Sequence, residues 1–165
     1  MATLIGKLLR RLVRSDSGTE LIEFALTLPL LLLVVLGIIE SGFIFQEYEV
    51  VTNAAREGAR IAVLPTYAAT QPARVNNTTA RVNQYLTAGG LNFSLATKTV
   101  GVPVLSNLAA PAAGCVSTVA VTVTYPHPVV FLGGIMSYFG SGFGNITLRA
   151  TSEMRTEVAA GAPCP

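Results

Sequence analysis

The most hydrophobic part of the chain is a run near its N-terminus, directly behind a short basic leader. Residues 24–39 carry no charge, and extending the run back to Leu21 adds only Glu23. An α-helix rises about 1.5 Å per residue, so this run is about 24–29 Å long, against ~30 Å for the hydrocarbon core of a membrane. The pattern therefore predicts one membrane-spanning helix.

The helical pattern continues beyond this run. Uncharged residues follow Glu40, so the helix can extend past it, and the first strong stop is Pro65. We predict one long helix from about Thr19 to Leu64. Pro29 lies inside it, where it should remove one backbone hydrogen bond and kink the helix.

Small side chains recur every four residues in the second half of this helix. They are Ala54, Gly58 and Ala62, with Ala55 and Ala59 beside them. The spacing places them on one stripe of the helix, where another backbone can approach closely. We favour the interpretation that the stripe receives the protein's own sheet. The alternative is that it packs against neighbouring subunits.

A shorter helix and several strands follow. Residues 72–86 are predicted to be helical, because proline suits the first turn of a helix and Gly89–Gly90 suits its end. Residues 119–125 and 146–154 alternate apolar and polar side chains as half-buried strands do, and residues 93–105 give a weaker strand. We predict an α+β fold, in which a long N-terminal helix, membrane-spanning in its first half, packs on a small antiparallel β-sheet.

The connection between the two good strands, Pro126 to Asn145, is unusually apolar for a loop and rich in glycine and aromatic residues. We favour a buried or half-helical crossover. The alternative is an exposed apolar surface for a partner or for the outer leaflet of the membrane.

Composition and charge placement predict the orientation. Hydrophobic residues make up 51% of the chain and charged residues 12%, against roughly 25% charged in soluble domains. Four basic residues precede the span, opposed only by Asp16, whereas three glutamates follow it. Because positive residues stay on the cytoplasmic side, we expect a cytoplasmic N-terminus and an extracytoplasmic body. The basic cluster is short and contains no aromatic residue, so nucleic-acid binding is a poor interpretation.

The two cysteines, Cys115 and Cys164, lie before the first good strand and after the second. If the strands are antiparallel neighbours, the start of one lies beside the end of the other, so the cysteines could meet. An exported location permits oxidation, and we predict a disulfide, with two free thiols as the alternative. Two distant cysteines and one histidine do not make an ordinary zinc site, so no metal is expected.

The sequence shows no motif of an enzyme. The single histidine, His127, lies between two prolines and has no nucleophile motif to accompany it. A Walker loop and a Gly-x-Gly-x-x-Gly motif after a strand are both missing. We expect no catalytic residue and no cofactor, and a membrane-tethered hydrolase is the least favoured class.

Three stretches carry a resemblance to a known family. The first is Gly-Thr-Glu-Leu-Ile-Glu-Phe (residues 18–24), followed by Ala-Leu-Thr-Leu-Pro-Leu-Leu-Leu-Leu. The second is residues 52–60, and the third is residues 121–126 with residues 146–151. With these stretches the chain resembles a TadE-like minor pilin, or pseudopilin, of the tight adherence (Flp pilus) assembly system.

The resemblance implies that a prepilin peptidase cuts after Gly18, which makes Thr19 the new N-terminus. A secretory signal peptide would instead need a small-x-small site after the apolar run, and the sequence offers none there. Glu23 and Phe24 then lie at the entrance to the span and serve assembly and recognition. Glu23 is expected to pair with the free amine of a neighbouring subunit, the alternative being that it reaches the cytoplasmic headgroups of an uncut chain.

On this interpretation the chain has three parts: a basic leader (1–18), a transmembrane helix (19–45) and an extracytoplasmic α+β domain (46–165). The protein is expected in the inner membrane as a single-pass subunit, with the pilus as an alternative location, and is expected to have no enzymatic activity. Its expected partners are a prepilin peptidase, other minor pilins and pilus assembly proteins. The alternative function is that of an unprocessed single-pass envelope scaffold whose outer domain binds other subunits.

Overall fold

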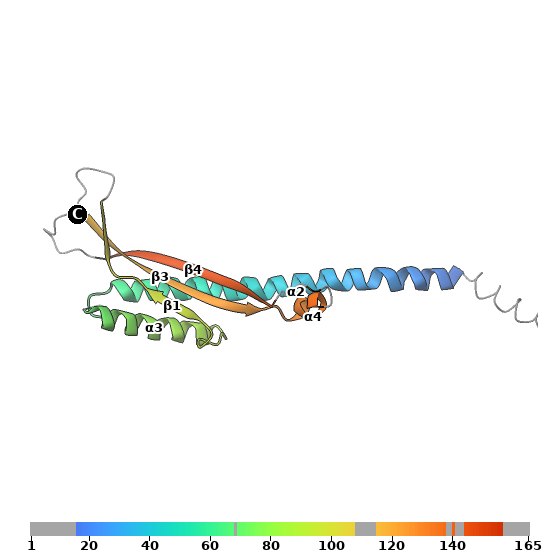
Figure 1. Cartoon of the computed structure of the whole chain (residues 1–165), viewed down its shortest axis with the longest axis horizontal. Coiled ribbons are helices and arrows are strands. Elements are labelled where there is room, and N and C mark those ends of the chain that lie inside the picture. Colours follow the sequence, from blue (N-terminus) through green and yellow to red (C-terminus); the bar gives the residue numbers. More distant parts are fainter. Residues whose placement is uncertain (1–15, 68, 108–114, 138–139, 141–143, 157–165) are drawn as a thin grey trace, which may run out of the picture.

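The structure is a computed structural model that describes residues 16–67, 69–107, 115–137, 140 and 144–156. Its elements, in chain order, are α2 (Asp16–Val63), α3 (Gln71–Ala88), β1 (Thr97–Val100), β2 (Val104–Asn107), β3 (Cys115–Pro128), α4 (Phe131–Ser137) and β4 (Asn145–Thr156). The fold is the predicted one, a long N-terminal helix packed on a small antiparallel β-sheet. The first half of α2 projects beyond the rest of the molecule (Figure 1).

Helix α2 has 48 residues and is therefore about 72 Å long. It begins three residues before the predicted start and ends at Val63, two residues before Pro65. It is continuous through Pro29, and Figure 1 shows no sharp bend along α2. At its C-terminal end the Arg74 guanidinium of α3 donates to the carbonyl of Ala62 at 3.0 Å, which satisfies one of the last free carbonyls.

Helix α3 confirms the predicted short helix and extends it by one or two residues at each end. The Thr70 hydroxyl accepts a hydrogen bond from the amide of Ala73 at 3.3 Å and so caps the N-terminus. The chain leaves the helix through Gly90, whose φ of 79° is in the left-handed region that favours glycine. An ion pair docks α3 on α2, because the Arg81 guanidinium lies 2.7 Å from the carboxylate of Glu57.

Strand β3 is the centre of the sheet. β4 pairs with it antiparallel along twelve positions, from Ser117↔Thr156 to Pro128↔Asn145. β1 and β2 follow one another along its other edge, pairing with Thr124–Val121 and Thr118–Cys115. The predicted weak strand is thus two short strands, which Gly101 and Pro103 separate.

The two prolines near the end of β3 lie where the sheet edge is open. The amide of Gly101 donates to the carbonyl of Ala120 at 2.9 Å, so the even-numbered residues of β3 direct their backbone polar groups to the β1 edge. Pro126 and Pro128 have the same parity and lie beyond Thr124, the last residue of β3 that β1 pairs with. Their missing amide hydrogens therefore cost no ladder hydrogen bond.

The core lies between the second half of α2, helix α3 and one face of the sheet. The odd-numbered residues of β3 face it, and Val119, Val121 and Val123 are fully buried. Opposite them on α2 lie the small residues of the predicted stripe, with Ala54, Ala55, Ala59 and Ala62 fully buried.

Gly58 shows why the stripe consists of small residues. A Cβ placed there would lie 2.6 Å from a methyl group of Val82 in α3 and 3.2 Å from one of Val121 in β3. The protein's own helix and sheet therefore occupy the stripe, as in the first of the two interpretations. Neighbouring subunits cannot reach it while the domain is folded.

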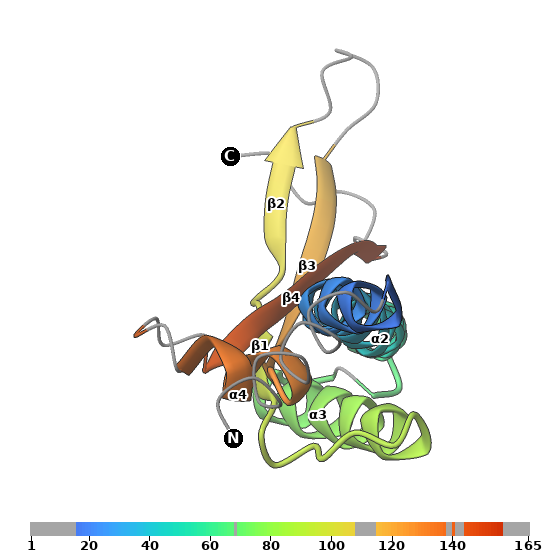
Figure 2. The ribbon, with the colours of Figure 1, turned by 90° about the vertical axis from the view of Figure 1, so that its right-hand side faces the viewer.

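The apolar connection after β3 contains a short helix. β3 continues to Pro128, and α4 then lies alongside α2 (Figures 1 and 2). The half-helical crossover is thus present in the described part of this connection. The predicted disulfide lies outside the described residues, since Cys164 is not among them and the side chain of Cys115 is not described.

Candidate functional site: an exposed apolar helix and the polar cluster at its base

The first half of α2 exposes a continuous apolar surface. Within the described residues it is the one helix long and apolar enough to cross a membrane, with a mean hydropathy of 2.6 over its most apolar 18 residues. No part of that window is buried within the chain. Leu26, for example, is 75% exposed. Such a surface is not stable in water and requires lipid or other subunits around it.

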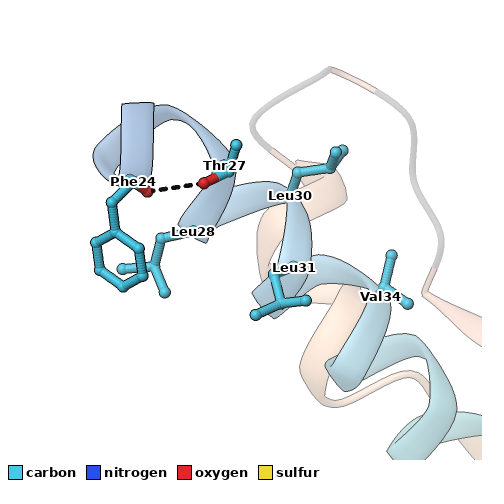
Figure 3. Close-up of a pocket in the computed structure, with 6 residues that line it drawn as sticks. All are labelled: Phe24, Thr27, Leu28, Leu30, Leu31 and Val34. Carbon is cyan, nitrogen blue, oxygen red and sulfur yellow. Dashed lines mark hydrogen bonds between the residues drawn. The ribbon is translucent and has the colours of Figure 1, made fainter. Parts of the chain in front are cut away.

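The residues predicted for processing and assembly all lie at the N-terminal end of this surface. Gly18 and Thr19 are in the first turns of α2, and the Glu23 side chain is exposed. Phe24 is exposed and lines a shallow apolar groove along one side of the helix (Figure 3). The groove is otherwise lined by Thr27, Leu28, Leu30, Leu31 and Val34.

Thr27 has its hydroxyl turned to the helix backbone. Its Oγ1 lies 3.0 Å from the carbonyl oxygen of Glu23 and 3.2 Å from that of Phe24, and the second contact is drawn in Figure 3. The hydroxyl is therefore satisfied without water or a partner. The roles of Gly18, Thr19, Glu23 and Phe24 stay predictions, because the structure contains a single chain.

A second feature lies where the apolar surface meets the folded domain. His127, near the end of β3, is only 3% exposed and lies between two carboxylates of α2. Its Nδ1 is 2.8 Å from Oε2 of Glu47, and its Nε2 is 3.1 Å from Oε1 of Glu40. Ionised carboxylates only accept hydrogen bonds, so both ring nitrogens donate when both glutamates are charged, and the ring is then an imidazolium.

Glu40 also binds the start of α4. Its carboxylate accepts hydrogen bonds from the backbone amides of Val130, Phe131 and Leu132 at 3.0, 2.7 and 3.4 Å. The first amides of a helix have no partner within the helix, and a negative charge there is favourable. Glu40, itself only 3% exposed, therefore ties α2, β3 and α4 together. We refer to Glu40, Glu47 and His127 as the clasp.

The two carboxylates favour the protonated form of His127. Burial lowers the pKa of the imidazolium, but the hydrogen bonds and charges of Glu47 and Glu40 outweigh burial and raise the pKa above its usual value of 6.5. With all three groups ionised the clasp has a net charge of −1. The three amides at the start of α4 face that charge.

Sequence reasoning missed the clasp, although two signals for it were present. Glu40 and Glu47 are seven residues apart, which places them on the same side of a helix. His127 continues the inward-facing series of Val123 and Tyr125 by one more step of two. The predicted strand nevertheless ends at Tyr125, because a proline such as Pro126 usually marks the end or edge of a strand.

In the described part of the chain, the clasp included, no group of three or more His, Cys, Asp or Glu side chains is placed to hold a metal ion. The described side chains thus form two candidate features, the apolar half of α2 and the clasp at its base.

Comparison with known proteins bears on the first of these features, the apolar half of α2. Residues 18–60 match the model of the TadE-like protein family. No curated protein and no solved structure matches the chain significantly.

The TadE-like match confirms the resemblance found in the sequence. It begins at Gly18, the residue after which cleavage is predicted, and it includes Glu23, Phe24 and most of the small-residue stripe. It also includes Glu40 and Glu47, but it ends before β3 and α4. The TadE-like segment is therefore helix α2, and the clasp joins it to the part of the chain beyond the match.

Proposed function

We propose that this chain is a non-enzymatic minor pilin, or pseudopilin, needed to assemble a Flp-type (tight adherence) pilus, and that a prepilin peptidase processes it after Gly18. The observation that carries the proposal is the exposed apolar half of α2, which has Glu23 near its N-terminal end and lies inside a TadE-like segment. The folded domain lies at one end of this surface and Gly18 at the other, as a subunit that is cut and then assembled within a membrane requires.

Glu23 fits the proposal energetically. A carboxylate at the centre of a bilayer costs about 2.5–3.5 kcal/mol, and less near the interface, so an isolated glutamate here is unfavourable without a partner. In the described residues the Glu23 side chain has no hydrogen bond or ion pair within the chain. The partner that we propose is the amine that cleavage would free on Thr19 of a neighbouring subunit. Within each chain, Thr19 and Glu23 are four residues apart.

N-terminal sequencing of the protein extracted from membranes of its own host tests the processing step. We expect the chain to begin at Thr19, and we expect Gly18→Leu to leave it uncut and to abolish pili. Normal piliation with the uncut variant would contradict the proposal.

Glu23→Ala separates assembly from processing. We expect normal cleavage with a large loss of assembled pili, because the partner of the new amine is missing. Glu20→Ala is the matched control, since Glu20 is an exposed acid one turn earlier on the same helix and should affect neither step. Equal piliation in the Glu23 and Glu20 variants would remove the proposed role of Glu23.

The second candidate function is the unprocessed envelope scaffold. It is favoured by the size of the domain beyond the TadE-like match, which offers a large surface for other subunits. If N-terminal sequencing of the protein extracted from the membrane shows an uncut N-terminus, the scaffold is favoured over the pilin.

A further inference from the structure

Apolar side chains remain exposed around α2 at the level of the clasp. Phe43 is 47% exposed and Phe45 72%, and they point to different sides of the helix, being two residues apart. Beside them, Val130 and Phe131 at the start of α4 are 64% and 39% exposed. The rings of Phe43 and Phe131 stack with their centroids 6.2 Å apart. We call these four residues the apolar collar.

The collar lies where the far boundary of the membrane would be. From Leu21 to Phe43 the helix rises about 33 Å, close to the ~30 Å thickness of the hydrocarbon core. Phenylalanine is among the apolar residues that interfacial helices bury at the boundary between headgroups and acyl chains. The collar is also continuous with the exposed apolar half of α2, so no polar band separates the two surfaces.

The polar groups near the collar are satisfied inside the protein. Glu40 is the one charged residue between Phe24 and Phe45, and the clasp buries it. The amides at the start of α4 bind its carboxylate. Residues 129–137 carry no charge. A segment that enters the boundary of a membrane must satisfy its backbone and shield its charges in this way, because lipid offers no partners.

We infer that the collar is a membrane-surface anchor: α4 lies in the outer boundary of the same bilayer that α2 spans, with the collar in contact with lipid. The clasp provides the chemistry for this, since it neutralises the start of α4 and removes Glu40 from the lipid. The inference requires that α2 spans a membrane, but it does not require cleavage after Gly18. An uncut chain with a lipid-embedded collar would therefore remove the pilin proposal and leave the anchor standing.

The chain contains no tryptophan, so a single introduced tryptophan reports on its own position. We would place Val130→Trp, in the full-length protein, in phosphatidylcholine nanodiscs whose lipids are brominated either near the headgroup end or near the end of the acyl chain. Val130 is well exposed, which leaves room for the larger ring. Val34→Trp provides a reference within the span, and Phe93→Trp, at an exposed position after α3, provides the aqueous reference.

We expect blue-shifted emission from Val130→Trp, with loss of most of its fluorescence in lipids brominated near the headgroup and a smaller loss with deep bromines. Val34→Trp should show the reverse order. Emission and quenching like those of Phe93→Trp would overturn the inference. A blue shift that depends on protein concentration and occurs without quenching by the bromines would overturn the inference in favour of a second copy on the collar. If Val130→Trp does not fold, Phe45→Trp, on another side of α2, carries the same expectation.

Discussion

Glu40→Ala removes the side chain on which the clasp depends. The substitution leaves three backbone amides at the start of α4 without their acceptor, and it leaves His127 with one carboxylate in place of two. Breaking a buried charge pair by removing one partner costs about 3–5 kcal/mol. Because 1.4 kcal/mol corresponds to a factor of ten, α4 should detach from α2 roughly a hundredfold to a few thousandfold more often.

Hydrogen exchange of the full-length protein in nanodiscs measures this opening directly. We expect the amides of residues 130–132 to lose protection by that factor, while amides of α3 keep theirs. His127→Ala should cost less, since Glu40 keeps its amide donors. Glu49→Ala is the control, because Glu49 is an exposed acid on the same helix, outside the clasp. Unchanged protection of residues 130–132 in Glu40→Ala would refute the reasoning and would show that apolar packing alone holds α4.

Two other predictions follow from the buried contacts. The pKa of His127 is raised, so the imidazolium stabilises the fold fully below about pH 6.5, and this contribution is lost as the pH rises through the folded-state pKa. The midpoint of thermal unfolding of the wild type should therefore fall as the pH rises above about 6.5. His127→Gln should make this midpoint less dependent on pH. Gly58→Ala should lower the free energy of unfolding by about 1–3 kcal/mol through overpacking against Val82. In the double variant, Val82→Ala should restore part of the stability that Gly58→Ala loses. Gly42→Ala is the control and should not destabilise the fold, because no heavy atom lies within 4 Å of its added Cβ. Additive losses of stability at Gly58 and Val82 would contradict the packing argument.

The elements with strong periodicity could be predicted from the sequence. The apolar run fixed the first half of α2, and Pro65 its end. The inward valines of β3 predicted both the strand and its buried face, because alternate side chains of a strand point to the same side. The predicted bounds of α3 are within two residues of the observed ones, since Pro72 and the two glycines act locally.

The clasp could not be predicted in the same way, because its parts are far apart in sequence. His127 and Glu40 are 87 residues apart, and no periodicity within either segment says which partner the other will meet. A charge at the edge of an apolar run is usually solvated, so the pattern groups Glu40 with the two exposed-looking glutamates that follow the run and gives it no buried partner. The split of the weak strand into β1 and β2 was missed because it depends on how Gly101 meets Ala120 of β3 across the sheet.

Because α2 is uninterrupted, a change in the tilt of its first half also moves the folded domain at its other end. With the lipid-exposed half and the domain core on one 48-residue helix, and with the clasp and α4 bracing the point where they meet, the domain cannot hinge freely on its anchor. Membrane helices tilt on average by about 20°, and over about 72 Å such a tilt moves the far end sideways by about 25 Å. A change in the tilt angle of the embedded half therefore displaces the far end of the domain by a distance comparable to the width of a small protein.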